Sequence, residues 1–222
     1  MDKSIQCYTI NWEEAYRLAR TVSHKIIESG FEPDIVIAVS RGGLVPARMV
    51  CDLLLHNNLT TIRTEHWDTA SKHEMARIKF SLPKEADVSG KKVLIMDDVA
   101  DTGGSFSVII DYLNEKDHVE IRTAVLHYKT CSTVIPDYWG EELKDWNWII
   151  YPWAFYEDMA GFVEELLSCP MTAEELRKGL ISNFNITMSR KGLLKMLGDL
   201  SQLGKIKKSE KNKKILWERL KS

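Results

Sequence analysis

The sequence lacks the features that would place the chain in a membrane, in a disulfide-stapled secreted scaffold or among the phosphate-loop nucleotide hydrolases. No apolar run approaches the roughly 20 residues that a membrane helix requires, and residues 1–6 lack the apolar core of a signal peptide. The four cysteines are scattered without a Cys-x-x-Cys pair, which argues against a zinc site and for free thiols. The motif Gly-x-x-x-x-Gly-Lys-Ser/Thr is absent. We therefore expect a cytoplasmic globular protein that has no membrane partner.

Charge is distributed unevenly along the chain. The net charge is only −2, yet residues 170–222 carry 13 Lys and Arg against 5 Asp and Glu. A basic segment behind an acidic one suggests two units with different partners. We predict one domain over residues 1–157 and a second, small basic domain over residues 158–222.

Residues 93–105 carry the strongest chemical pattern of the chain. An apolar run typical of a buried parallel strand turns into three carboxylates and a Thr-Gly-Gly-Ser loop, and apolar residues then recur at helical spacing. Backbone N–H groups and hydroxyls at the start of a helix bind anions, most readily phosphate. Carboxylates beside a phosphate repel it unless they contact its hydroxyl groups, a metal or a proton. The stretch therefore predicts a sugar phosphate that binds together with a divalent ion.

A second strand and glycine loop precede this stretch. Residues 35–39 are apolar, a Ser-Arg-Gly-Gly loop follows at residues 40–43, and residues 44–55 are typical of a helix with Pro46 in its first turn. Alternating strands and helices predict an α/β fold, with a mostly parallel twisted sheet and helices on both faces. Since ligands in such sheets bind beyond the carboxyl ends of the strands, both loops should face one crevice.

The remaining segments complete the predicted architecture. We expect strands over residues 59–65 and 119–126, a polar mobile loop over residues 66–78 that returns as a strand through residues 78–82, and an irregular segment over residues 136–145. The basic domain has the pattern of a winged helix-turn-helix, in which three helices precede two strands. Its elements are expected at residues 160–167, 173–181, 190–203, 206–209 and 214–218, with a capping box of Thr172 and Glu175 before the second helix.

Several of these motifs resemble those of one family. Residues 93–105 closely resemble the phosphoribosyl-diphosphate motif of type I phosphoribosyltransferases: an apolar strand, two acids, two further residues, a third acid and Thr-Gly-Gly-Ser. Residues 39–46 resemble the diphosphate loop of the xanthine-guanine members. Lys129 stands where the 6-oxopurine enzymes place a lysine on the purine O6, and residues 148–153 resemble their base-stacking hood. The likeness covers residues 10–160 in the order that the family uses.

The resemblance implies magnesium-dependent transfer of a 5-phosphoribosyl group from phosphoribosyl diphosphate to a 6-oxopurine (guanine, xanthine or hypoxanthine), as in purine salvage. It makes Asp101 the general base for the purine N7 proton, and it assigns Mg²⁺ and the ribose hydroxyls to Asp97 and Asp98. The residues expected to bind phosphoribosyl diphosphate are Ser40, Arg41, Gly42, Gly43, Asp97, Asp98, Asp101, Thr102, Gly103, Gly104 and Ser105. The residues expected to bind the purine are Lys129 on the C6 carbonyl, Trp148 by stacking and Ile149 through its backbone.

Alternatives stay open at the level of sequence. Arg41 and Lys129 are of types that are usually solvated or ion-paired, and an aromatic such as Trp148 is by default a core residue. Ala154 stands where relatives carry an acid that contacts magnesium. A rival hypothesis makes the chain a DNA-binding transcriptional regulator whose phosphoribosyltransferase domain senses a purine or phosphoribosyl diphosphate. A third makes the basic tail an oligomerisation or nucleotide-binding appendage. We also expect a homo-oligomer, by the same resemblance.

Overall fold

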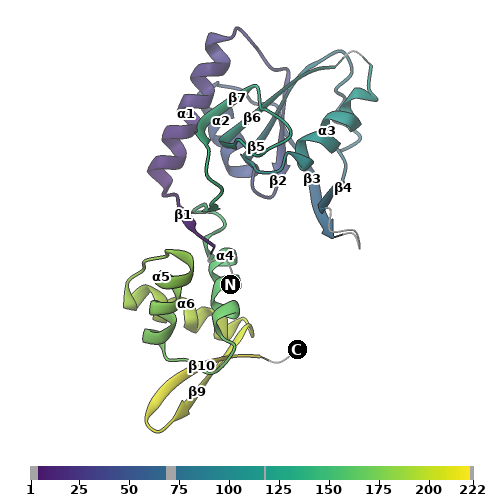
Figure 1. Ribbon diagram of the computed structural model, residues 1–222. Coiled ribbons are helices and arrows are strands. Elements are labelled where there is room, and N and C mark those ends of the chain that lie inside the picture. The colour runs from purple at the N-terminus through teal and green to yellow at the C-terminus, as the bar shows by residue number, and fades with distance from the viewer. Residues whose placement is uncertain (1–4, 69–73, 118, 221–222) are drawn as a thin grey trace. The chain divides into compact units, whose positions relative to one another are not determined.

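The computed structural model describes residues 5–68, 74–117 and 119–220, with the backbone alone for residues 66–68, 74 and 75. The chain divides into two compact units (Figure 1). The central unit is Trp12–Trp146. The terminal unit joins the N-terminal Met1–Asn11 to Asn147–Ser222. Each unit has its own sheet and its own helices.

The central unit is built on a six-stranded sheet in the order β4-β3-β2-β5-β6-β7, in which only β4 runs antiparallel to its neighbour. Its strands are β2 (Ile35–Ser40), β3 (Leu59–Asp68), β4 (Glu74–Phe80), β5 (Lys92–Ala100), β6 (Glu120–Lys129) and β7 (Tyr138–Leu143). Its helices are α1 (Trp12–Glu28), α2 (Leu44–Leu53) and α3 (Gly104–Asn114). The predicted α/β fold with a mostly parallel sheet is confirmed.

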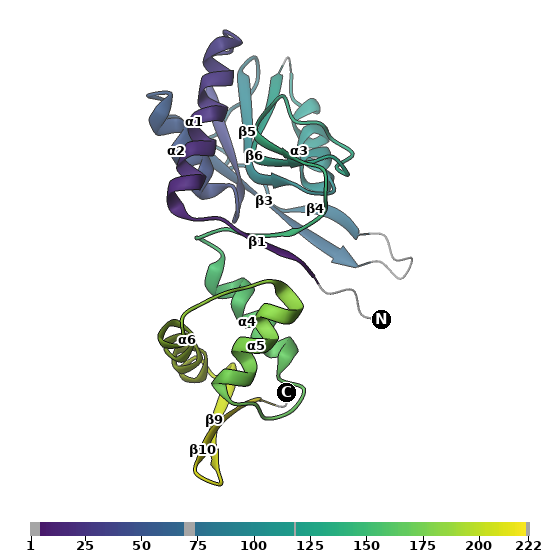
Figure 2. The same cartoon turned by 60° about the vertical axis from the view of Figure 1, so that its left-hand side comes forward.

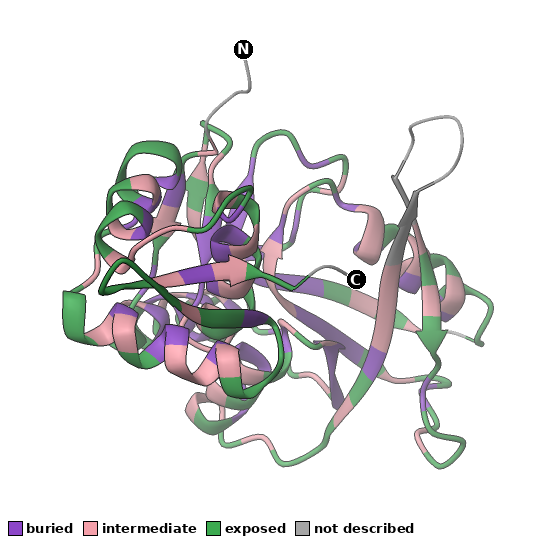
Figure 3. Cartoon of the chain, turned by 90° about the horizontal axis from the view of Figure 1, so that it is seen from below, coloured by how far each residue is buried: buried purple, intermediate pink, exposed green. Residues whose placement is uncertain are grey.

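Helices cover both faces of this sheet (Figure 2). On one face Phe106, Ile109 and Leu113 of α3 pack in one apolar cluster with Ile37 and Val39 of β2. Helices α1 and α2 pack together on the other face, where α2 contacts β2 and β5 and α1 contacts β6 and β7. The first five residues of β2 are buried, because a parallel strand between two helical layers has no solvated side. Buried and exposed residues alternate along the helices (Figure 3).

The β3–β4 hairpin extends through most of the segment expected to be a polar loop. The prediction was wrong for the residues up to Asp68 and from Glu74 to Arg77, which pair as antiparallel strands; His73 lies outside the described residues. Glu65 accepts hydrogen bonds from Arg77 across the hairpin and from Lys79. The hairpin packs against α3 near its base, where Ile62 is buried and Ile78 contacts the same apolar cluster. The remaining pairs are mostly polar, so this part of the sequence shows no apolar alternation.

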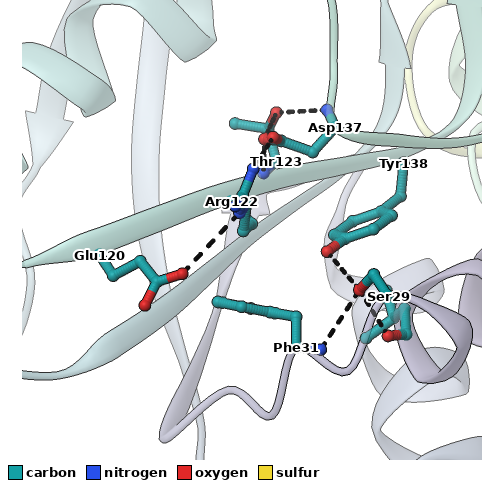
Figure 4. A network of polar contacts seen from close by, with 8 residues as sticks. Ser29, Phe31, Glu120, Arg122, Thr123, Asp137 and Tyr138 are labelled. Atoms are coloured by element: carbon teal, nitrogen blue, oxygen red, sulfur yellow. Dashed lines mark hydrogen bonds and ion pairs between the residues drawn. The ribbon is translucent and has the colours of Figure 1, made fainter.

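The prediction was also wrong for β7, which lies inside the segment that we expected to be irregular. Its start is anchored by Asp137, which accepts hydrogen bonds from the backbone N–H and the hydroxyl of Thr123 and from Arg122 (2.8–2.9 Å; Figure 4). Tyr138 bonds the hydroxyl of Ser29 at the end of α1 (2.8 Å). These contacts fix an edge strand of polar sequence against β6.

The described residues of the terminal unit, 5–11 and 147–220, form three helices and two short sheets. Its strands are β1 (Cys7–Thr9), parallel to β8 (Trp148–Ile150), and the antiparallel hairpin β9 (Ile206–Lys211) with β10 (Lys214–Arg219); its helices are α4 (Phe155–Leu166), α5 (Ala173–Phe184) and α6 (Arg190–Gln202). The capping box of Thr172 and Glu175 forms as predicted. Met171 bridges antiparallel to Trp217 of β10.

The chain passes from one compact unit to the other between residues 11 and 12 and again between residues 146 and 147, whereas the predicted domain boundary lies after residue 157. The physical reason is that Cys7 of β1 and Ile150 of β8 belong to the same apolar cluster as Met159 and Phe162 of α4. The segment expected to form the hood therefore packs with the helices of the basic segment.

Candidate active site

The two glycine loops meet at one pocket, as the sequence predicts. The pocket has a volume of about 270 Å³ and lies at the carboxyl ends of β2 and β5. Its lining residues are Val39, Ser40, Gly42, Thr64, Asp97, Asp98, Val99, Ala100, Asp101, Thr102, Gly103, Gly104, Ser105 and Phe106. Strand ends meet there because β2 and β5 are parallel neighbours, with Ala38 beside Met96 in the register.

Glycine is required where the loops come closest to the sheet. A Cβ atom at position 42 would overlap the carboxylate of Asp98. Gly103 has φ +86°, and a Cβ there would lie 2.7 Å from the backbone nitrogen of Val134. Only glycine combines this left-handed conformation with this approach. The space that a side chain would need is already filled at both positions, by Asp98 beside Gly42 and by residues 132–134 beside Gly103.

The loop after β5 ends in the N-terminus of α3, which starts at Gly104 with Gly103 as its N-cap. The first N–H groups of a helix lack partners within the helix and carry a partial positive charge, so they bind anions. The hydroxyl of Ser105 lies 3.0 Å from that of Thr64 on β3. Thr64 thus adds a hydroxyl that the sequence patterns did not single out.

Asp97 and Asp98 form an electrostatically strained pair in this pocket. Burial raises the pKa of Asp97 well above its ordinary value, and the neighbouring Asp98 carboxylate raises it further. The backbone N–H of Asp98 donates to Oδ1 of Asp97 (2.9 Å), which opposes part of that rise. Two adjacent carboxylates of this kind favour a cation or a hydroxyl-rich ligand beside them.

Asp101, Lys129 and Trp146 form a second polar group at the ends of β5, β6 and β7. Lys129 Nζ donates to Asp101 Oδ2 (2.9 Å), and Trp146 Nε1 donates to Asp101 Oδ1 (3.0 Å). The Lys129 side chain is only 4% exposed, so it is not the solvated lysine that its sequence position alone suggests. Trp146 is a residue that the sequence analysis missed, and no periodicity or motif marks it.

The other predicted residues lie elsewhere. Arg41 is exposed and does not line the pocket; its peptide bond to Ser40 is cis. Gly43 packs against the backbone of β5, and its N–H donates to Val39 O of β2 (2.8 Å). Trp148 and Ile149 belong to the terminal unit. There Trp148 is 40% exposed and meets Phe162 edge to face, while Ile149 is buried.

Comparison with known proteins identifies the family. The family model of the phosphoribosyl transferase domain matches residues 10–158 of the chain. The chain belongs to the phosphoribosyltransferase family. The matched region holds both glycine loops, Asp101 and Lys129, and the predicted phosphoribosyltransferase function is confirmed.

Individual phosphoribosyltransferases resemble the same part of the chain. The chain is 28% identical over 155 residues to a xanthine-guanine phosphoribosyltransferase of Nitratidesulfovibrio vulgaris strain Hildenborough, covering 68% of this chain and 87% of that protein. It is 27% identical over 171 residues to one from Chromohalobacter salexigens (75% and 94% covered). The crystal structure of a purine phosphoribosyltransferase from Pyrococcus horikoshii aligns with a TM-score of 0.58 and 30% identity, over 67% of this chain and 94% of that one.

The helices in the described part of the chain are short or carry charged residues. None of its helices is long and apolar enough to cross a bilayer.

Proposed function

We propose that this phosphoribosyltransferase acts on 6-oxopurines, with phosphoribosyl diphosphate as the sugar donor and magnesium as the cofactor. The observation that carries the proposal is the contact between Lys129 Nζ and Asp101 Oδ2. It puts a hydrogen-bond donor beside an acceptor. A 6-oxopurine presents the matching pair on one edge, a carbonyl at C6 and an N–H at N7. Adenine has an amino group at C6, and a lysine cannot accept a hydrogen bond from that group. The relatives named for xanthine, guanine and purine substrates support the same class.

The residues of the pocket supply the chemistry of such a transfer. Asp101 would take the proton from N7 as the purine nitrogen attacks the anomeric carbon and diphosphate leaves. The N-terminus of α3 and the hydroxyls of Thr102 and Ser105 would hold the 5′-phosphate. Asp98 and Asp97 would hold the ribose hydroxyls. Ser40, Arg41 and the glycines after β2 are proposed to meet the diphosphate.

The two adjacent carboxylates fit a magnesium ion. Asp97 and Asp98 offer oxygen ligands, and Mg²⁺ is usually held by one or two carboxylates together with substrate phosphates. The described residues include no group of three or more His, Cys, Asp and Glu that could hold a metal by themselves, so substrate oxygens would complete the shell. When bound, the ion neutralises negative charge on the diphosphate. Ala154 stands where relatives carry an acid that contacts magnesium. Glu157 and Asp158, in the first turn of α4, are the acids nearest to it in sequence.

A substrate panel tests this proposal. Purified protein is given phosphoribosyl diphosphate and Mg²⁺ with hypoxanthine, guanine, xanthine, adenine or orotate in turn, and nucleotide product is measured by chromatography. We expect product from at least one 6-oxopurine, little from adenine or orotate, and none after chelation with EDTA until Mg²⁺ is restored. Turnover of adenine or orotate in preference to every 6-oxopurine would overturn the substrate assignment.

As a second candidate function, we propose that the terminal unit is a winged helix that binds duplex DNA. A groove of about 640 Å³ supports this proposal, lined by the start of α5, one face of α6 and the β9–β10 hairpin. Its lining holds one acid, Glu174, and four cations, Arg190, Lys208, Lys213 and Lys214. These cations form the basic groove.

The hairpin tip gives a further reason to regard the basic groove as functional. The two turn residues, Asn212 and Lys213, have φ of 51° and 61°. Such a turn favours glycine at its second position, and a lysine there is held in an unfavourable conformation. A cation kept at that position despite its backbone cost is typical of a residue that contacts a ligand.

DNA binding is tested by gel shift with random-sequence duplex over a range of salt concentrations. Neutralising one contacting lysine, as in Lys213→Gln, should reduce the slope of log affinity against log salt by about one. Lys84→Gln in the central unit is the matched control. Absence of any salt-sensitive shift would remove this candidate without affecting the enzyme. The predicted homo-oligomer stays a prediction, which light scattering of the same preparation tests.

A further inference from the structure

Trp146 lies where the carboxyl ends of three neighbouring strands come together. In the sheet, β5, β6 and β7 are adjacent and parallel, with Ala100 beside Tyr128 and Lys129 beside Leu143. Asp101 directly follows β5, Lys129 ends β6, and Trp146 follows β7. Segments far apart in sequence therefore contribute one side chain each to one place.

Each of these three side chains contacts the other two. Trp146 Nε1 donates to Asp101 Oδ1 (3.0 Å), Lys129 Nζ donates to Asp101 Oδ2 (2.9 Å), and Lys129 Nζ lies 4.6 Å from the centre of the Trp146 ring. Both oxygens of the Asp101 carboxylate thus have a donor. The lysine is held by a carboxylate and by the face of an aromatic ring, a favourable site for a cation.

Burial does not explain the placement of this tryptophan. The Trp146 side chain is 50% exposed, so apolar packing alone does not fix its ring. Its indole N–H instead donates to the Asp101 carboxylate, which is itself 36% exposed. Water competes for the oxygens of that carboxylate. A hydrogen bond to a charged group is among the stronger polar interactions in proteins.

We infer that Trp146 is a positioning residue for the base Asp101. This inference rests on the proposed function. When a 6-oxopurine binds, Lys129 exchanges its contact with Oδ2 for the C6 carbonyl, and Oδ2 becomes the acceptor for the N7 proton. Without a second anchor the carboxylate is free to rotate after the lysine leaves. Trp146 holds Oδ1 throughout, so that Oδ2 keeps facing the purine edge and the proton passes from N7 to that oxygen.

The test is a double-mutant cycle between Trp146→Phe and Asp101→Asn. Phenylalanine keeps an aromatic face for Lys129 and removes only the N–H donor and the second ring. We expect Trp146→Phe to lower kcat/KM for the purine by roughly 10- to 100-fold, the size expected for loss of one hydrogen bond to a charged group. The KM for phosphoribosyl diphosphate and the melting temperature should not change. Trp12→Phe is the matched control, since Trp12 is 55% exposed and α1 contributes no residue to the pocket.

The cycle separates positioning from a merely structural role. If Trp146 acts through Asp101, then Trp146→Phe causes no further loss in the Asp101→Asn background, measured in single turnovers at high enzyme concentration. Equal losses in both backgrounds, or full activity of Trp146→Phe, would overturn the inference while the proposed function stands. Full activity of Asp101→Asn would overturn the proposed function, and the role of Trp146 with it.

Discussion

Gly42, in the loop after β2, and Asp98, near the end of the neighbouring parallel strand β5, lie so close that a side chain at position 42 would have to displace the Asp98 carboxylate. A Cβ atom there would overlap both carboxylate oxygens of Asp98. Asp98 in turn shares the pocket with Asp97, whose pKa is raised by burial. The conformation of the loop after β2 therefore limits where the Asp98 carboxylate at the end of β5 can lie.

Gly42→Ala should displace Asp98 and weaken the binding of phosphoribosyl diphosphate. Overpacking of this kind costs about 1–3 kcal/mol, and each 1.4 kcal/mol is about a tenfold change in affinity. The measurements are the KM for phosphoribosyl diphosphate and the melting temperature. Gly161→Ala on α4 is the control, because a Cβ at that position meets nothing within 4 Å; it should leave KM unchanged. Normal KM in Gly42→Ala would mean that Asp98 tolerates displacement.

Asp101→Asn should abolish most turnover while it preserves binding of phosphoribosyl diphosphate. A general base contributes typically 10²- to 10⁴-fold to the rate, and the amide of asparagine cannot take the N7 proton. Rates are measured with the preferred 6-oxopurine and donor binding by calorimetry. Asp52→Asn, on the exposed face of α2, is the control and should be fully active. Loss of donor binding in Asp101→Asn would show that Asp101 serves mainly the sugar.

Lys129→Gln should change which purine is accepted. Removing a charged donor from the C6 carbonyl should lower kcat/KM for guanine by roughly 10- to 100-fold. The glutamine carbonyl can accept a hydrogen bond from the amino group of adenine, so the ratio of adenine to guanine turnover should rise. The ratio is measured with both bases in one reaction. Lys84→Gln should leave the ratio unchanged, and an unchanged ratio in Lys129→Gln would contradict the assigned contact.

His127 should make the stability of the central unit sensitive to mild acid. Burial lowers the pKa of this histidine from 6.5 to about 4, and the positive charges of Arg17 and Lys129 contribute. Between these two pH values the unfolded chain binds a proton that the folded chain does not. The free energy of unfolding therefore falls as the pH drops from 6.5 to 4, by about 3 kcal/mol for this group.

The pH effect is measured by urea unfolding of the wild type and of His127→Met at several pH values. The variant should lose less stability than the wild type over that interval, whatever its stability at pH 7. Identical slopes of unfolding free energy against pH would show that His127 does not carry the effect. Acidic groups contribute to both proteins alike and cancel in the comparison.

The polar hairpin and the edge strand show where sequence patterns fail. Strands β2 and β5 are recognisable because continuous burial requires continuous apolar sequence. Strands β4 and β7 lie at the two edges of the sheet, where side chains meet water and backbone hydrogen bonds carry the pairing. Those backbone hydrogen bonds do not require particular residue types, so the sequence of a polar strand cannot be distinguished from that of a loop.

Local sequence is sufficient to identify the two glycine loops, the acids in and directly after β5 and the family of the chain, because backbone approach and phosphate binding demand particular residues at fixed local spacing. Tertiary structure is what buries Lys129 against Asp101 and adds Trp146 to the group. It also decided that β8 packs with α4 in the terminal unit. Contacts of this kind join distant segments through strand register and apolar packing, which leave no periodic signal along the chain.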